Sequence, residues 1–401
     1  MNKGMLSFDE ALARLLADAR PVAQVEEVET LAALGRVLAV GVYSQVDVPP
    51  ADNSAMDGYA VRAADLDAAG VRLPVSQRIP AGSVGHTLAP GTAARIFTGG
   101  QLPAGADAIV MQELCAHEGD HVVINHVPAP GEWVSWRGED IAAGSEILPA
   151  GTRMRPQEMG VAASAGLRTV VVKRQVRVAL FCTGDELTQP GEPLPPGGIY
   201  NSNRYTLRGL LEQMGCVVED FGNVPDRLDA TRDALRRAAA GNDLIVTSGG
   251  VSMGEEDHVR PAVMAEGRLD LWKIAIKPGK PLAFGHVGDA AFIGLPGNPV
   301  SSFVTFLMLV RPFVQILQGG AAVTPRRLRV QAAFEWPRPD VRREFLRARL
   351  LDDGRVALYP NQRAGVLTSA VWADGLVDNP PGQAVGVGDM VSFVPFSELL
   401  G

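Results

Sequence analysis

Alternation of apolar runs with helical stretches and glycine-rich loops dominates the chain between residues 176 and 317. Short β-branched runs such as Asp243–Thr247 predict buried strands, and stretches of helical periodicity separate them. This order predicts a doubly wound α/β sheet, and crossovers of this length favour parallel strands. We therefore expect the loops that follow the strands to lie along one edge of the sheet, where open α/β sheets bind ligands.

The N-terminal part of the chain carries two other patterns. Ser7 followed by Glu10 is a capping pattern, and leucines at helical spacing predict an amphipathic helix over 7–19. A second helical stretch is expected over 28–38. From 46 to 144, short valine and isoleucine runs separated by glycine, proline and aspartate predict an all-β segment.

Helical periodicity returns over 156–167, so the β segment is expected to be an insertion and the first domain to be discontinuous. After Gly319-Gly320, short apolar runs again predict strands, and Asp352-Asp353-Gly354 predicts a hairpin turn between two of them. This C-terminal part predicts a small β-barrel or sandwich.

Composition narrows the class of protein. At 401 residues, two to four domains are expected, and 46% hydrophobic with 20% charged residues is ordinary for a folded globular protein. A net charge of -8 argues against a general nucleic-acid binder. The three cysteines are too scattered for a disulfide framework, which favours a reducing cytosol. No leader pattern or long uncharged apolar run is seen, so secretion and membrane spanning are not expected.

The loop Ser248–Asp257 carries the strongest chemical signal. Glycines at the end of a predicted strand allow backbone N–H groups to approach a phosphate or another oxyanion. The acidic residues beside them are able to hold Mg²⁺ against the same anion. A mere connector would have little use for this composition, so the loop predicts chemistry on a phosphorylated substrate.

Two further loops are predicted at the same edge. Thr183–Glu186 follows the strand predicted over 177–182, and Lys277–Pro281 follows the one predicted over 271–276. Together with the Ser248 loop they would supply two carboxylates and two ammonium groups to an anion-and-metal site. Taken singly, the first is equally typical of a helix N-terminus and the second of a solvated loop.

Weaker candidates lie elsewhere. Asp226 follows another predicted strand and is also typical of a turn or helix cap. The turn Leu295–Pro299 precedes a long helix whose free N–H groups are able to hold an anion, and it is equally typical of a simple tight turn. Asp52–Ala60 and Arg137–Asp140 are dense in polar side chains, although composition alone makes both of them surface turns. The six histidines show no metal-ligand spacing.

Taken together, these motifs resemble one family closely. The chain is similar to the MoeA family of molybdopterin molybdenumtransferases, to which the E domain of gephyrin is also similar. The resemblance rests on motifs in the family's order: Asp52–Tyr59, Thr98-Gly99 with Pro103, Arg137–Asp140, Thr183–Leu187, Ser248–Asp257, Lys277–Pro281 and Leu295–Pro299.

The resemblance implies a fold of four parts. These are an elongated discontinuous domain (1–45 and 145–175), a β-rich insertion (46–144), an adenylyltransferase-like α/β domain (176–320) and a C-terminal β-barrel (321–401). It also implies a cytoplasmic homodimer in which the α/β site of one subunit faces the β insertion of the other. The implied reaction takes adenylylated molybdopterin and molybdate, inserts molybdenum into the dithiolene and releases AMP with the help of Mg²⁺.

The resemblance also implies roles for particular residues. Asp57, Asp140, Glu186, Asp226 and Asp257 are the expected catalytic carboxylates, with Glu186, Asp226 and Asp257 as the Mg²⁺ ligands. The expected substrate-binding residues are Thr98, Arg137, Ser248, Gly249, Gly250, Ser252, Lys277, Lys280, Pro296 and Ser369. In the C-terminal segment, Asp374 stands where the family leads us to expect asparagine, and Arg363 is bulkier than usual.

Two other functions remain open on the sequence. A molybdopterin adenylyltransferase would use a similar α/β domain, and such an enzyme is also a possible partner of this chain. A non-enzymatic scaffold like gephyrin is the other alternative, although the chain carries no fused adenylyltransferase domain or long linker.

Overall fold

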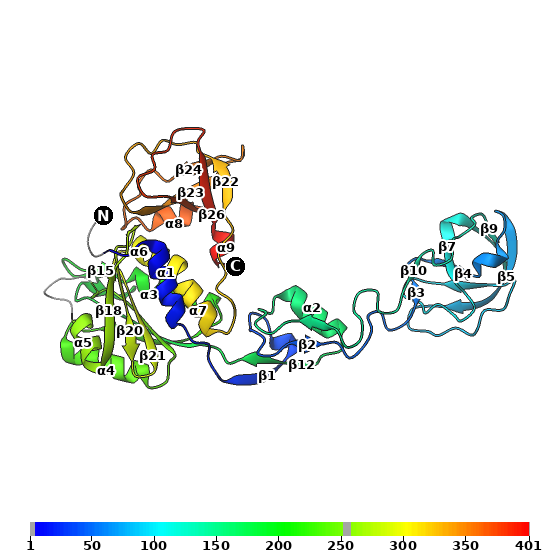
Figure 1. Cartoon of the computed structure of the whole chain (residues 1–401), viewed down its shortest axis with the longest axis horizontal. Helices are drawn as coiled ribbons and strands as arrows, with labels where there is room; N and C mark the ends of the chain where they lie inside the picture. Colours follow the sequence, from blue (N-terminus) through cyan, green and yellow to red (C-terminus); the bar gives the residue numbers. More distant parts are fainter. Residues whose placement is uncertain (1–4, 252–257, 401) are drawn as a thin grey trace. The chain divides into compact units, whose positions relative to one another are not determined.

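The computed structural model describes residues 5–251 and 258–400, without the side chains of Leu271 and Trp272. The chain forms two compact units (Figure 1). The larger contains Met1–Glu26, Gly35–Ala39 and Val172–Gly401, and the smaller contains Glu27–Leu34 and Val40–Val171. The finer division into four domains stays a prediction.

A six-stranded sheet forms the centre of the larger unit. Its order is β16-β13-β17-β21-β20-β18. The strands are β13 (Arg177–Thr183), β16 (Val217–Val224), β17 (Leu244–Ser248), β18 (Gly267–Lys273), β20 (Pro281–Val287) and β21 (Ala290–Leu295). The first four strands in this order run parallel, as expected.

The expectation of parallel strands is wrong for β20, which runs antiparallel to both of its neighbours. Only Gly288 and Asp289 separate β20 from β21, and a link of two residues makes a hairpin because it is too short for a crossover. Since β18 is antiparallel to β20, its carboxyl end still lies at the same edge as those of β13, β17 and β21.

Helices cover both faces of this sheet (Figure 1). One core cluster joins alternate sheet residues such as Leu180 and Val246 to α1, α3, α6 and α7, and a second joins their neighbours Phe181 and Ile245 to α4 and α5. Burial on both faces explains why these strands read as continuous apolar runs. The helices are α1 (Phe8–Asp18), α3 (Ser202–Gln213), α4 (Leu228–Ala239), α5 (Val259–Glu266), α6 (Pro299–Thr305) and α7 (Arg311–Leu317).

The N-terminal helix begins as predicted. Ser7 Oγ accepts from the Glu10 N–H, and the Glu10 carboxylate accepts from the Ser7 N–H, which confirms the capping box.

Among the described residues, one helical stretch has the length and apolar composition of a membrane span. It runs from Pro299 to Leu317 and includes a π-helical turn, Phe306–Val310. Because 89% of its most apolar window is buried inside the protein, it is accounted for as a core helix.

The C-terminal strands form a second six-stranded sheet in the larger unit. Its order is β19-β23-β25-β26-β22, with β24 paired to β23. The elements are β19 (Ile276–Lys277), β22 (Leu328–Gln331), β23 (Arg343–Leu350), β24 (Val356–Leu358), β25 (Gly375–Asn379) and β26 (Met390–Pro395), with α8 (Thr368–Trp372) and α9 (Phe396–Leu400). The predicted hairpin at 352–354 is confirmed, since Leu350 pairs with Val356.

One strand links this sheet to the α/β layer. The strand predicted over 271–276 is interrupted: β18 ends at Lys273, and β19 pairs in parallel with β23, with Lys277 opposite Glu344. The Lys277 loop therefore lies between two sheets and is held by both.

The smaller unit is mostly β. Its main sheet has the order β7-β4-β6-β5-β9-β8, and the pair β5–β6 is parallel. The strands are β4 (Gly58–Val61), β5 (Val71–Ile79), β6 (Ala93–Ile96), β7 (Ala108–Met111), β8 (Cys115–Glu118) and β9 (His121–Ile124). Short pairs β2 (Val42–Tyr43) with β11 (Glu146–Leu148) and β3 (Asn53–Ser54) with β10 (Val134–Ser135) accompany α2 (Pro156–Ser164).

The helix expected over 28–38 is wrong. Residues 25–29 form β1 (Val25–Glu29), which pairs with β12 (Thr169–Lys173), and only a short 3₁₀ turn, Thr30–Ala32, follows. Leu31 and Leu34 are exposed while Ala33, Val37 and Leu38 are buried, so the apolar residues of this stretch do not form one helix face.

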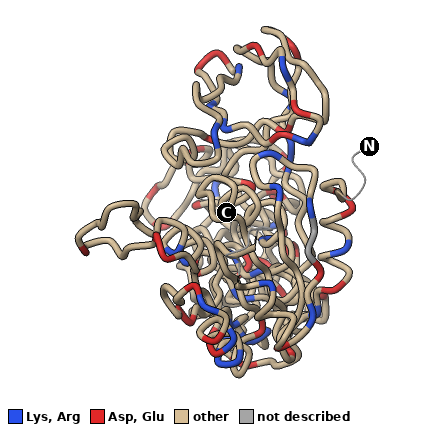
Figure 2. Tube along the Cα trace, turned by 90° about the vertical axis from the view of Figure 1, so that its left-hand side faces the viewer, with Lys and Arg blue, Asp and Glu red and all other residues tan. Residues whose placement is uncertain are grey.

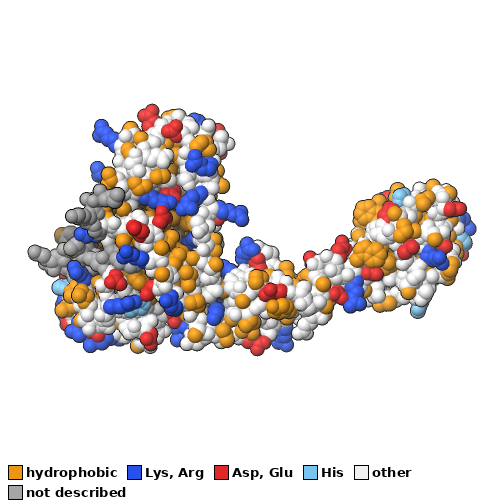
Figure 3. Space-filling view, in the orientation of Figure 1, with side chains coloured by type: hydrophobic (Ala, Val, Ile, Leu, Met, Phe, Trp, Pro, Cys, Tyr) orange, Lys and Arg blue, Asp and Glu red, His pale blue; other side chains and the backbone are white. Residues whose placement is uncertain are grey.

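Acidic and basic residues are interspersed along the trace (Figure 2). On the side seen in Figure 3, charged and hydrophobic side chains are likewise mixed over the surface.

Candidate functional site

A cavity of about 850 Å³ lies at the edge of the α/β sheet where β13, β17 and β21 end. It is lined by the loops after β13, β16, β17 and β21, by the loop between β19 and β20, and by the C-terminal sheet and its connections. The polar and glycine residues of its lining include Thr183, Gly184, Glu186, Asp226, Gly249, Gly250, Lys277, Lys280, Asn298, Trp336, Arg342, Gln362 and Arg363.

The topology explains why the cavity is here. Strand β13 pairs with β16 on one side and with β17 on the other, although the chain visits them in the order β13, β16, β17. Loops after two neighbouring parallel strands diverge at such a switch point and leave a crevice between them. The predicted convergence of the Thr183, Ser248 and Lys277 loops at one edge is thus observed for their described residues.

Gly249 and Gly250 are required by close packing. Their φ angles are +93° and +64°, and a Cβ on Gly249 would lie 2.5 Å from the backbone oxygen of Thr183. A Cβ on Gly250 would lie 2.5 Å from Val259 Cγ2. The Gly249 N–H donates to the Leu295 carbonyl, so this amide serves the sheet edge rather than an anion. Glycine here allows two loops to approach each other.

Ser248 has a different role from the expected one. It is 2% exposed, its Oγ donates to the Pro296 carbonyl at 3.1 Å, and Asn203 Nδ2 donates to it at 2.8 Å. The Ser248 side chain therefore fastens the ends of β17 and β21 together. It borders a second hollow of about 330 Å³ and does not line the large cavity.

Two of the three expected metal ligands lie in the cavity wall. Glu186 and Asp226 both line it, and Gly184 leaves room for the Glu186 carboxylate, which would lie 2.6 Å from a Cβ at that position. Asp257 and Ser252 lie outside the described residues. No group of three or more potential metal ligands occurs within 5–251 and 258–400. Mg²⁺ commonly uses one or two carboxylates together with substrate phosphates, so the donor set that is present fits this ion.

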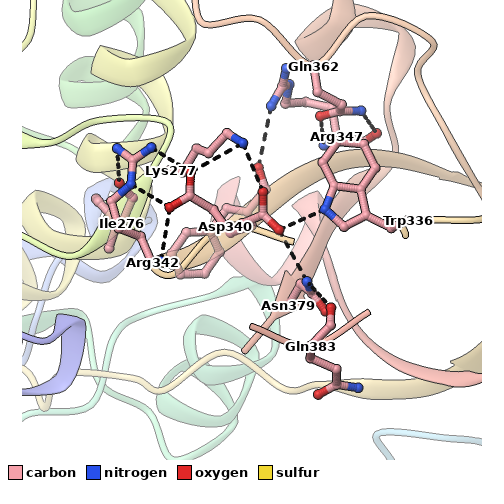
Figure 4. A network of polar contacts seen from close by, with 11 residues as sticks. Ile276, Lys277, Trp336, Asp340, Arg342, Arg347, Gln362, Asn379 and Gln383 are labelled. Carbon is pink, nitrogen blue, oxygen red and sulfur yellow. Dashed lines mark hydrogen bonds and ion pairs between the residues drawn. The ribbon is translucent and has the colours of Figure 1, made fainter. Parts of the chain in front are cut away.

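Lys277 is held by two carboxylates, one from the segment before β23 and one from β23 itself (Figure 4). Its Nζ lies 3.1 Å from Glu344 Oε1 and 3.5 Å from Asp340 Oδ2. Glu344 is fully buried and also accepts from Trp336 Nε1 at 2.7 Å and from Asn379 Nδ2 at 3.3 Å. A buried carboxylate with three donors is well satisfied, so Lys277 is a positioned ammonium group rather than a loose one.

Beside it, Asp340 and Arg342 form a two-pronged pair at 2.8 Å for each hydrogen bond. The Arg342 guanidinium holds the pKa of the Asp340 carboxyl well below its usual range. Arg342 itself lines the cavity, so this pair presents a cation whose orientation is fixed.

Ser369 is buried and does not line the cavity. Its Oγ accepts from Arg347 Nε at 3.0 Å and donates to the Val366 carbonyl. Arg347 also donates to the Arg363 carbonyl, and its backbone exchanges hydrogen bonds with Gln362 (Figure 4). Burial lowers the pKa of Arg347 to about 10. Ser369 thus supports the segment 362–364 that forms the wall, instead of contacting a ligand as expected.

Lys280 and Pro296 are both in the lining. Lys280 is exposed, and no ion pair or hydrogen bond of its side chain occurs in the described part of the chain. Its ammonium group is therefore available to an anion in the cavity.

The remaining candidates belong to the smaller unit. Asp57 Oδ1 accepts from both the N–H and the Oγ1 of Thr98, each at 2.8 Å, and these hydrogen bonds lower the pKa of Asp57. Arg137 Nε donates to Asp47 Oδ2 at 2.5 Å, and the Asp140 carboxylate is exposed. Asp57 and Thr98 are brought together as a pair.

Replacing Thr98 with valine is expected to raise the pKa of Asp57 toward its ordinary value, because the hydroxyl donor is lost while the backbone donor remains. Since the folded-state pKa is depressed, the stabilisation from this contact exists above the unfolded pKa of about 4 and disappears as the pH falls through the folded value. An NMR titration of the Asp57 carboxyl carbon measures the change. An unchanged midpoint would show that the hydroxyl does not favour the ionised form.

Sequence reasoning missed Trp336, Asp340, Arg342 and Glu344 as site residues. Glu344 begins the strand that the sequence predicts over 344–351, and Arg342 lies two residues before it, where nothing in the local pattern marks either residue. The usable signal was Trp336 in a segment rich in proline and charge, because a tryptophan near solvent often needs a partner for its N–H.

Comparison with known families accounts for most of the chain. Residues 6–166 match the model of the MoeA N-terminal region (domain I and II), 179–316 a probable molybdopterin binding domain, and 329–396 the MoeA C-terminal region (domain IV).

Individual relatives belong to the same family as these models. A molybdopterin molybdenumtransferase of Haemophilus influenzae is 41% identical over 79% of this chain and 78% of its own length. Molybdopterin molybdenumtransferase 2 of Mycobacterium tuberculosis is 38% identical over 94% of this chain and 95% of its own length. The crystal structure of a molybdopterin biosynthesis MoeA protein from Pyrococcus horikoshii superposes with a TM-score of 0.85 at 28% identity, covering 98% of this chain and all of that one.

Proposed function

This chain belongs to the MoeA family, and on that premise we propose that it is a molybdopterin molybdenumtransferase. It takes molybdenum from molybdate, inserts it into the dithiolene of adenylylated molybdopterin and releases AMP. The observation that carries the proposal is the cavity at the switch point of the α/β sheet, where a glycine turn, two carboxylates and several cations line one space.

The charges of the lining suit these substrates. Molybdate and the phosphates of adenylylated molybdopterin are anions, and Lys280, Arg342 and Arg363 present cations to the cavity. Lys277 adds an ammonium group that Glu344 holds in place, so its position is set before substrate arrives.

Glu186 and Asp226 are the described residues that would hold Mg²⁺. When bound, this ion neutralises charge on the phosphoanhydride that is cleaved. Asp257 is proposed as a third ligand from the family motif, beyond the residues that the structure describes.

We further infer a cytoplasmic homodimer. In it, Asp57, Thr98, Arg137 and Asp140 of one subunit would complete the cavity of the other by positioning substrate and transferring protons. Family membership supports this, and it supports the finer assignment of the α/β layer as adenylyltransferase-like and of the C-terminal sheet as a β-barrel.

The test is a reconstitution with adenylylated molybdopterin, molybdate and Mg²⁺. We expect AMP release that depends on molybdate and yields cofactor able to activate an apo-molybdoenzyme. Removing Mg²⁺ with a chelator is expected to stop it. Adenylylation of molybdopterin from ATP in the absence of molybdate would instead identify an adenylyltransferase, and unchanged cofactor formation after Asp226→Asn would favour a scaffold.

In the same assay, Lys280→Ala is expected to raise KM for the anionic substrate about tenfold, because one charge-assisted hydrogen bond is worth about 1.5 kcal/mol or more. Lys273→Ala is the matched control, since this exposed lysine lies nearby but does not line the cavity. An unchanged KM for Lys280→Ala would remove this residue from the site.

A further inference from the structure

The smaller unit contains another hollow, of about 820 Å³, which none of the functions above uses. It lies over β4, β5, β6 and β8 and is lined by Tyr59, Arg78, Arg95, Phe97, Gln112 and Cys115, among others. We call this surface the arginine face. Its volume is within the range of small-molecule sites.

Two arginines lie opposite each other on it. Arg78 of β5 and Arg95 of β6 are partners in the ladder between these strands. Like charges directly opposite on a sheet destabilise it. Within the described ranges neither guanidinium forms a salt bridge with a carboxylate, although the negative charge of Asp57 attracts Arg95. An anion bound between the two guanidinium groups would offset the repulsion that is left.

Aromatic rings hold the two guanidinium groups in place. Arg78 lies 4.8 Å and Arg95 4.6 Å from the ring centre of Phe97, and Arg95 also lies 5.2 Å from that of Tyr59. Arg95 donates further to the Gly58 carbonyl and to Gln112 Oε1. Arg95 is therefore held by two rings and two hydrogen-bond acceptors, whereas Arg78 lies on the Phe97 ring and is exposed to solvent. Planar guanidinium groups bind phosphate with two hydrogen bonds and stack on flat rings.

The thiol in the hollow is not a nucleophile. Burial raises the pKa of Cys115 to about 11, so at neutral pH this group is a protonated, weakly polar wall. The arginine face is thus built for binding rather than for covalent chemistry.

We propose that the arginine face is a second ligand site and that it binds a nucleoside monophosphate. The phosphate lies between Arg78 and Arg95, and the base stacks on the exposed guanidinium plane of Arg78. A nucleotide held here would adjoin the Asp57–Thr98 pair, because Thr98 follows Phe97 and Asp57 precedes the strand of Tyr59.

Equilibrium dialysis of the full-length protein with AMP, adenosine and inorganic phosphate tests the proposal. Arg78→Gln and Arg95→Gln are expected to weaken AMP binding at this site about tenfold each, as for a lost hydrogen bond to a charged group. Arg72→Gln is the matched control, because Arg72 lies on the same strand but pairs with Glu118. Circular dichroism verifies folding, and Arg78 is exposed enough to be replaced without loss of packing.

Wild-type affinity for AMP in both Arg78→Gln and Arg95→Gln would overturn the proposal. Equal affinity for phosphate and AMP would overturn the assignment of the base. The Lys280→Ala variant separates this site from the large cavity: binding that Lys280→Ala abolishes belongs to the cavity, and binding that only the arginine variants lose belongs to the arginine face. A failure of the proposed molybdenum insertion would not change the binding that only the arginine variants lose.

Discussion

Replacing Gly249 with alanine is expected to abolish molybdenum insertion and to destabilise the larger unit by about 3 kcal/mol. A residue at φ +93° is strained whenever it carries a Cβ, and this Cβ would lie 2.5 Å from a backbone oxygen that cannot move without displacing β13. Backbone strain and overpacking each cost about 1–3 kcal/mol. Urea unfolding and the reconstitution assay measure the two effects.

Gly209→Ala is the matched control for Gly249→Ala. Gly209 lies in α3, has open space around its Cβ position and has no positive φ, so alanine there is expected to leave activity intact and to stabilise the helix slightly. An active, stable Gly249→Ala protein would show that the two loops are able to separate without cost, which would weaken the argument for a preformed crevice.

Replacing Glu344 with glutamine is expected to give the second-largest effect, a loss of about 2 kcal/mol of stability together with at least a tenfold fall in kcat/KM. Glu344 is fully buried and accepts from Lys277, Trp336 and Asn379. The amide is able to keep the two neutral donors, but its NH₂ group would face the Lys277 ammonium. Removing one partner of a buried charged contact costs more stability than removing one partner of a surface ion pair. The partial exposure of Lys277 reduces this loss of stability.

Fluorescence-detected unfolding suits the Glu344→Gln variant, because Trp336 contacts the altered group. The exposed Glu335 provides the control, and Glu335→Gln is expected to behave as wild type. If Glu344→Gln lost stability but kept its kcat/KM, Lys277 would not be a positioned part of the site.

Much of the site was predictable because it depends on local pattern and topology. Buried apolar strands followed by glycine and acidic residues predict loops at one sheet edge, and Glu186, Asp226, Gly250 and Lys280 do line the cavity there. The two residues Gly288-Asp289 are also typical of a hairpin turn. The long crossovers elsewhere in this layer favoured parallel strands instead, so the hairpin was not predicted.

The roles of several side chains were not predictable. Ser248 and Ser369 carry hydroxyls that composition assigns to a ligand, yet both are buried and satisfied by Asn203, Pro296 and Arg347. Whether a hydroxyl meets a ligand or a neighbouring chain segment depends on residues that are distant in sequence. The hydrophobic periodicity of the sequence does not indicate which residues these are.

By itself, then, the sequence determined most of the order of strands and helices in the α/β layer, the edge at which their loops meet and the residue types found there, because strand burial and turn chemistry are encoded locally. Only the tertiary structure decided that the C-terminal sheet closes the cavity through Glu344, Trp336 and Arg342, and that Lys277 is held rather than free. The physical reason is that a buried polar group must find its partners wherever the folded chain brings them, and most of these partners come from other elements.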